Sequence, residues 1–138
     1  MDNTSKNLDI DVVEICKTTK TSLLDIEKSF KVKLTQKNKL LFPLDLLLNN
    51  LKTSDIFTDN LLFRLRHSYY IRNEQITNVY QLMTLERDTF LKYRNHGKKM
   101  YQLLKIILEK LDLDFLENMK ANKACKIYKL MNQKPTNL

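Results

Sequence analysis

Residues 90–111 read Phe-Leu-Lys-Tyr-Arg-Asn-His-Gly-Lys-Lys-Met-Tyr-Gln-Leu-Leu-Lys-Ile-Ile-Leu-Glu-Lys-Leu, and we expect the rest of the fold to be organised around them. The stretch contains Gly97, the only glycine in the chain. After Gly97, large apolar side chains recur at the i, i+3, i+4 and i+7 spacing of an amphipathic helix: Met100, Leu103, Leu104, Ile107, Leu108 and Leu111. The pattern predicts a hairpin at residues 94–97 and a helix from about Lys98 to Leu111.

Gly97 is expected at a position that other residues cannot occupy, because glycine reaches positive φ without a Cβ clash and lets another backbone approach closely. Lys98 and Lys99 follow it directly, in the first turn of the predicted helix. Free backbone N–H groups and the positive end of the helix dipole would add to the two ammonium groups. The stretch therefore predicts a phosphate-binding site; the alternative is a plain corner between two helices with solvated lysines.

The composition favours an all-α fold. The chain has 138 residues, of which 43% are hydrophobic, with one glycine, two prolines and no tryptophan. Such a chain suits a compact helical bundle with its own core, and we expect no β-sheet. The formal net charge of +8 favours an acidic partner such as nucleic acid.

The cysteines and the polar amino terminus indicate a cytoplasmic protein. Cys16 and Cys125 are isolated, and the sequence has no signal-like apolar core or apolar run of membrane length. His67 and His96 have no cysteine or histidine at metal-ligand spacing, and one glycine is too few for a glycine-rich nucleotide loop. We expect no cofactor, no metal, no membrane partner and no enzyme activity.

Three segments are predicted. Residues 1–52 form an N-terminal helical extension, residues 53–113 the central helical domain, and residues 114–138 a C-terminal helix with a basic tail. Leu40–Leu51 is too apolar to be left in water, so it should pack into the core of the central domain or into a dimer interface. The C-terminal segment is either a phosphate-contacting arm or a solvated helix face, because five lysines follow Glu117 with no further acid: Lys120, Lys123, Lys126, Lys129 and Lys134.

The extension carries a faint echo of the central domain. Five apolar positions recur 67 residues later, where Val12, Ile15, Cys16, Leu23 and Leu24 correspond to Val79, Leu82, Met83, Phe90 and Leu91. Phe30 then stands at the position of Gly97. A degenerate repeat and a helix-turn-helix over residues 11–30 are competing interpretations.

Between residues 58 and 113 the sequence resembles the C-terminal domain of the bacterial RNA polymerase alpha subunit. The resemblance runs without gaps from the Asp-Asn-Leu entry at Asp59 to the Asn-x-Gly-Lys-Lys motif, with an arginine about thirty residues before that motif. It also includes Ile76, Val79, Leu82, Leu91, Lys92 and the apolar positions of the long helix.

This resemblance implies a compact domain with a helix-hairpin-helix-like element, flanked here by extra helices. It implies docking on the backbone and minor groove of double-stranded DNA, usually at A/T-rich sequence. The arginine of the family enters the minor groove, and the hairpin holds phosphate. The matching DNA-binding positions are Arg66, Asn95, His96, Gly97, Lys98 and Lys99, with His96 contributing only as a hairpin residue that could contact phosphate.

Some positions depart from the family pattern. Tyr69 and Tyr70 replace its Asn and Cys, and His96 replaces a hydrophobic residue. Met100 replaces a phosphate-binding serine, and Leu103 replaces an acidic residue that often faces the groove. These changes affect base-edge and groove-width preference more than phosphate binding.

The leading hypothesis is a freestanding bacterial or phage relative: a non-catalytic, transcription-related or nucleoid-associated DNA-binding protein. The alternative is a protein-interaction module that keeps the fold and binds RNA polymerase or a transcription regulator, which Tyr69, Tyr70 and Met100 favour. A third hypothesis is a helper subunit of a repair or recombination machine. The sequence leaves the oligomeric state open.

Overall fold

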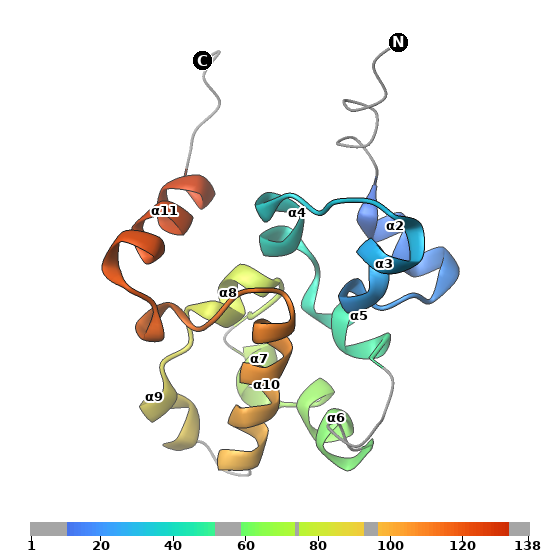
Figure 1. Ribbon diagram of the computed structural model, residues 1–138. Helices are drawn as coiled ribbons and strands as arrows, with labels where there is room; N and C mark the ends of the chain where they lie inside the picture. The colour runs from blue at the N-terminus through green and yellow to red at the C-terminus, as the bar shows by residue number, and fades with distance from the viewer. Residues whose placement is uncertain (1–10, 52–58, 74, 93–96, 133–138) are drawn as a thin grey trace.

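The computed structural model describes residues 11–51, 59–73, 75–92 and 97–132, and over these residues it confirms the predicted all-α fold (Figure 1). No strand occurs in the described part of the chain, where the only β-type pairing is one antiparallel bridge between Pro43 and Asn78. The helices are α2 (Val12–Thr19), α3 (Ile26–Phe30), α4 (Gln36–Leu41), α5 (Leu44–Asn49), α6 (Asp59–Arg66), α7 (Tyr69–Asn73), α8 (Val79–Met83), α9 (Arg87–Lys92), α10 (Lys98–Lys110) and α11 (Ala121–Met131), with 3-10 turns η1 (Leu23–Asp25) and η2 (Leu116–Asn118).

Helix α10 is the predicted long helix, and it begins at Lys98 as expected. It packs against α6 and α9, and it runs between them in Figure 1. Its apolar stripe is buried in the central hydrophobic cluster: Met100, Leu103, Leu104, Ile107 and Leu108. The 3.6-residue period after Gly97 therefore identified both the helix and the face that it buries.

The leucine-rich segment Leu40–Leu51 packs into the same core as the central helices, which confirms that expectation. Its inward residues are buried in one cluster with those of α6, α8 and α10: Leu40, Phe42, Leu44, Leu47, Leu48 and Leu51. Two backbone hydrogen bonds tie the segments together, from Leu44 N to Thr77 O at 2.9 Å and from Val79 N to Phe42 O at 3.1 Å. The proposed domain boundaries and the degenerate repeat stay predictions.

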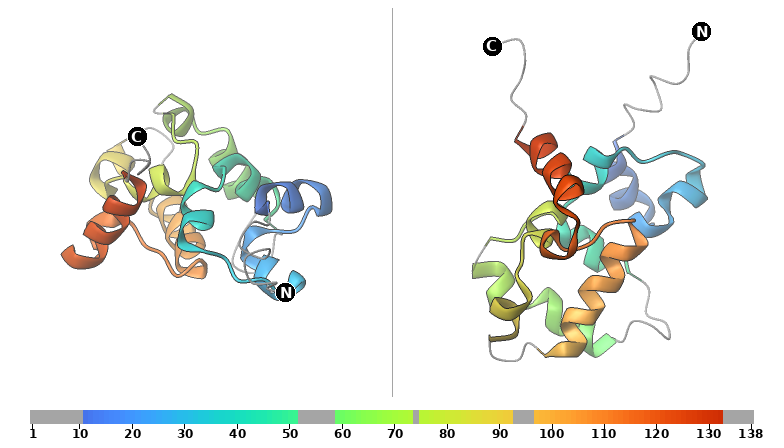
Figure 2. Two further views of the ribbon diagram at one scale, coloured as in Figure 1. Left: turned by 90° about the horizontal axis from the view of Figure 1, so that it is seen from above. Right: turned by 60° about the vertical axis from the view of Figure 1, so that its left-hand side comes forward.

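Helices α2 and α3 lie on the other side of α4 from α11 (Figure 2). Asn50, which caps the end of α5, holds α2 in place, because its amide nitrogen donates to the carbonyls of Cys16 at 3.0 Å and Thr21 at 3.1 Å. Cys16 and Leu23 are buried in the common cluster. The described part of the N-terminal extension, residues 11–51, thus contributes side chains to the common core.

The backbone at Gly97 corrects one expectation. Gly97 has φ −108° and ψ 177°, an extended conformation that any residue adopts, and a Cβ added there would meet nothing within 4 Å. The left-handed positions of the described chain are occupied by other residues: Lys20, Lys31, Gln75 and Asp112. The reasoning that a single glycine marks the most constrained backbone position was wrong.

The C-terminal end of α10 shows how such a position is held without glycine. Asp112, with φ 61°, donates its N–H to the carbonyl of Glu109 at 3.0 Å, and Leu113 donates to the carbonyl of Leu108 at 2.8 Å. This pair of bonds is a Schellman motif, and the buried Leu108 and Leu113 flank it. Gln75 and Ile76 form the same motif after α7. Burial and hydrogen bonding therefore impose the left-handed backbone on non-glycine residues.

Replacing Asp112 by glycine should stabilise the protein. An L-residue pays for the left-handed conformation, and a carboxylate opposes the dipole at a helix C-terminus. We expect Asp112→Gly to raise the free energy of unfolding by about 0.5–1 kcal/mol, measured by urea denaturation. Asp112→Asn, which removes only the charge, should give a smaller gain. An Asp112→Gly variant that is no more stable than the parent would contradict this account.

Several helix boundaries do not follow from residue type alone. Threonine often starts a helix, but Thr84 ends α8, where its hydroxyl donates to the carbonyl of Gln81 at 2.6 Å, and α9 begins only at Arg87. Aspartate also often starts a helix, but the carboxylate of Asp114 accepts from Lys105 Nζ at 3.0 Å, and the chain then makes the η2 turn. Helix α6 ends at Arg66, and α7 begins beyond Ser68.

Stability should fall between pH 9 and pH 11 because of Cys16. The side chain has no exposed surface, and burial raises the pKa of its thiol from 9.0 to about 11. Within this window the unfolded thiol loses its proton while the folded thiol keeps it, so rising pH favours unfolding by about 1.4 kcal/mol per unit. Urea unfolding at pH 8, 9, 10 and 11 should show a steeper loss in the parent than in Cys16→Ala. Parallel curves would refute this assignment.

Candidate nucleic-acid interface

The N-terminal end of α10 presents a positively charged surface. Gly97 is the N-cap residue, and no described side chain accepts a hydrogen bond from the first-turn N–H groups. Lys98 and Lys99 are exposed, and the described first turn contains no acidic residue. Free N–H groups, the helix dipole and two ammonium groups therefore coincide at one end of a 13-residue helix.

The rest of the predicted hairpin lies outside the described residues. This concerns Asn95 and His96, together with Tyr93 and Arg94. The side chains of Tyr69 and Tyr70 are likewise not described. The part of the candidate interface that the structure places is therefore Gly97, Lys98, Lys99 and Arg66.

Met100 and Leu103 belong to the core and not to a binding surface. Each is only 2% exposed, and both lie on the buried stripe of α10. The hypothesis that Met100 contacts a protein partner is wrong, because its side chain is covered by the fold itself. The same burial explains why apolar residues stand at these two positions.

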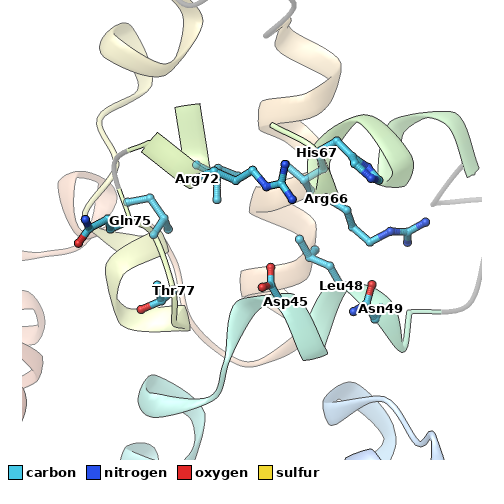
Figure 3. A pocket seen from close by; sticks show the side chains of 11 residues that line it. Asp45, Leu48, Asn49, Arg66, His67, Arg72, Gln75 and Thr77 are labelled. Carbon is cyan, nitrogen blue, oxygen red and sulfur yellow. The ribbon is translucent and has the colours of Figure 1, made fainter. Parts of the chain in front are cut away.

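Arg66 lies at the C-terminal end of α6 and is half-buried. Its side chain lines a cavity of about 400 Å³ together with His67, from the corner between α6 and α7, and Arg72, from α7 (Figure 3). None of the described lining residues belongs to α10. The structure therefore places Arg66 on a helix that packs against α10, but not in one pocket with the lysine pair.

The corner that brings His67 and Arg72 beside Arg66 was missed by sequence reasoning. The hydroxyl of Ser68 accepts from the N–H of Ile71 at 3.3 Å, and its carbonyl accepts from the N–H of Arg72 at 3.1 Å. Serine is a favoured residue for starting a helix in this way. That single residue was the available signal, within an otherwise continuous helical pattern.

The lysines of α11 form a separate basic surface. Lys120, Lys123, Lys126 and Lys129 are exposed, whereas Lys134 lies outside the described residues. Helix α11 packs against α4, and Figures 1 and 2 place it nearer to the C-terminal end of α10 than to its N-terminal end. The two lysine groups therefore do not form one continuous patch.

Comparison of the chain with protein-family models, with curated proteins and with solved structures finds no match. The resemblance to the alpha-subunit domain therefore stays a prediction. Among the described residues, no three His, Cys, Asp or Glu side chains are placed to hold a metal ion. No helix in that part of the chain is long and apolar enough to cross a membrane.

Proposed function

We propose that the protein binds double-stranded DNA without catalysing a reaction, in a transcription-related role. The observation that carries the proposal is the open N-terminal end of α10, where Lys98 and Lys99 are exposed beside uncapped backbone N–H groups. The net charge of +8 supports the same class of partner.

The contacts divide into two kinds. Gly97, Lys98 and Lys99 hold backbone phosphate, and Asn95 and His96 complete the hairpin. Such contacts position a protein on DNA and carry no sequence information. Arg66 supplies the second kind, because a guanidinium group is attracted to the narrow minor groove of A/T-rich DNA.

A titration tests this function. Labelled A/T-rich and G/C-rich duplexes of equal length are titrated with the protein at two salt concentrations. We expect binding that weakens steeply with salt, since phosphate contacts release counterions, and tighter binding to the A/T-rich duplex. The proposal is rejected if the duplex affinity at physiological salt is micromolar or weaker and does not change when Arg66, or Lys98 and Lys99, are substituted.

A protein-interaction module is the second candidate, and the exposure of Phe63 favours it. Phe63 lies on α6 with 55% of its surface exposed, and its ring packs on His67 at 4.3 Å between centroids. Large exposed aromatic residues are typical of interfaces with proteins such as RNA polymerase or a regulator. Phe63→Ala should weaken binding to a protein partner if the chain is an interaction module, and should leave duplex affinity unchanged if α10 binds DNA.

Substitutions at Gly97 can separate helix capping from phosphate binding. Asp and Asn both cap helices well, and a Cβ fits at this position without contact. We expect Gly97→Asp and Gly97→Asn each to raise the free energy of unfolding by about 0.5–1 kcal/mol. Only Gly97→Asp places a carboxylate against phosphate, so it alone should lower duplex affinity, by about tenfold or more. Equal duplex affinities for the two variants would show that phosphate does not lie at this helix end.

A further inference from the structure

The cavity at the α6–α7 corner has a basic side and a second side that carries a carboxylate and an amide. The corner contributes Arg66, His67 and Arg72, and α5 contributes Asp45 and Asn49 on the other side (Figure 3). Its volume of about 400 Å³ lies within the range of clefts that bind small ligands, about 300–1,000 Å³.

Among the described residues, neither guanidinium group of this cavity has an ion-pair partner. Neither Arg66 nor Arg72 forms an ion pair or a side-chain hydrogen bond with any described residue. Asp45 is the single acidic residue among the described residues that line the cavity. Two guanidinium groups that share a cavity repel each other, and an anion bound between them replaces that repulsion with attraction.

Phe63 holds the ring of His67 so that one ring nitrogen can contact a ligand in the cavity. Its Nδ1 lies 2.9 Å from the carbonyl oxygen of Phe63, and a carbonyl can only accept, so Nδ1 carries the proton and donates. The ring also packs on that of Phe63. In this tautomer Nε2 is an acceptor, so it can contact a ligand group that donates, such as a ribose hydroxyl.

The remaining lining suits the organic part of a ligand. The half-buried Ile76 provides apolar surface, while Asn49 and Thr77 provide amide and hydroxyl groups. Leu48 and Leu65 also line the cavity, but each is only 1% exposed. Apolar surface with a few polar groups accommodates a base and a ribose, whose hydroxyls need donors and acceptors.

We propose that this cavity binds the phosphomonoester group of a nucleotide, with the phosphate between Arg66 and Arg72. The planar fork of each guanidinium matches the oxygens of a phosphate, and a phosphomonoester carries up to two negative charges against one for a backbone diester. The group has two sources, a free nucleotide or the 5′-phosphorylated end of a DNA strand.

The test is isothermal titration calorimetry of the full chain with AMP and with adenosine. We expect AMP to bind at least about tenfold more tightly than adenosine. Arg72→Ala should lower the AMP affinity about tenfold or more, and Arg72→Lys, which keeps the charge but loses the fork, should lower it less. Arg72 is exposed, so neither change should unfold the chain. Lys110→Ala removes an exposed positive charge elsewhere and should leave the affinity within about twofold.

Two further ligands distinguish the sources. Single-stranded oligonucleotides with a 5′-phosphate or a 5′-hydroxyl replace AMP and adenosine. An Arg72-dependent preference for the phosphorylated strand, without one for AMP, assigns the site to DNA ends. The proposal is overturned if neither phosphorylated ligand outbinds its unphosphorylated counterpart, or if Arg72→Ala and Lys110→Ala have equal effects. Lys98→Glu with Lys99→Glu should leave AMP binding unchanged, because neither lysine lines the cavity. AMP binding can therefore fail while duplex binding by α10 succeeds, and the reverse.

Discussion

Reversing both charges at the start of α10, as Lys98→Glu with Lys99→Glu, should weaken binding to every duplex by a similar factor. Each phosphate contact contributes about 0.9 to the slope of log affinity against log salt, so losing two should flatten the slope by about 1.8. At 0.1 M salt this corresponds to a loss of about a hundredfold. Titration of A/T-rich and G/C-rich duplexes over a series of salt concentrations measures both quantities.

The matched control is the same double charge reversal on α11, Lys123→Glu with Lys126→Glu. Both pairs are exposed, so circular dichroism should show folded protein in each case. If the α11 variant loses as much affinity as the α10 variant, the effect is one of net charge and not of the α10 site. Arg66→Ala should behave differently from both, because it should erase the A/T preference more than it weakens binding.

Phe42→Ala should be among the most destabilising single substitutions in the N-terminal extension. Phe42 is only 1% exposed, and its carbonyl accepts the hydrogen bond that ties α4 and α5 to Val79. Removing a buried phenylalanine costs about 3–5 kcal/mol, a large share of the about 5–15 kcal/mol that stabilises a typical domain. Urea denaturation of the full chain measures the loss.

Leu41→Ala is the control for Phe42, since the neighbouring side chain is 47% exposed and should cost less than about 1 kcal/mol. A chain that begins at Thr53 tests the same claim more severely, because it lacks the buried leucines of α4 and α5. A monomeric Thr53 chain as stable as the full protein would show that the central helices need no cover from the extension.

The long helix could be predicted from the sequence because its signal is local and repeated. Six apolar residues keep one period after Gly97, and each of the five within α10 is buried. The short helices are too brief to repeat an apolar period over several turns. Thr84 and Asp114 are residue types that start helices, but here one ends a helix and the other pairs with Lys105. Their roles depend on neighbours that a local pattern does not contain.

One part of the candidate site could be predicted from the sequence, and the other part could not. Lys98 and Lys99 could be assigned to a helix start because they adjoin the residues that form it. The cavity lined by Arg66, His67 and Arg72 could not be predicted, because it depends on the corner at Ser68 and on the packing of α5 against α6. The left-handed backbone at Lys20 and Asp112 was also hidden, since neither residue is a glycine.

The amide signal of Gly97 offers the most direct measurement of where DNA binds. Gly97 is the only glycine, so protein labelled with ¹⁵N-glycine gives one backbone amide signal from the helix end in question. If phosphate binds at the start of α10, titration with an A/T-rich duplex should shift this signal saturably, in step with binding measured by fluorescence anisotropy. A signal that stays in place and unbroadened while the protein is saturated with duplex would contradict the account.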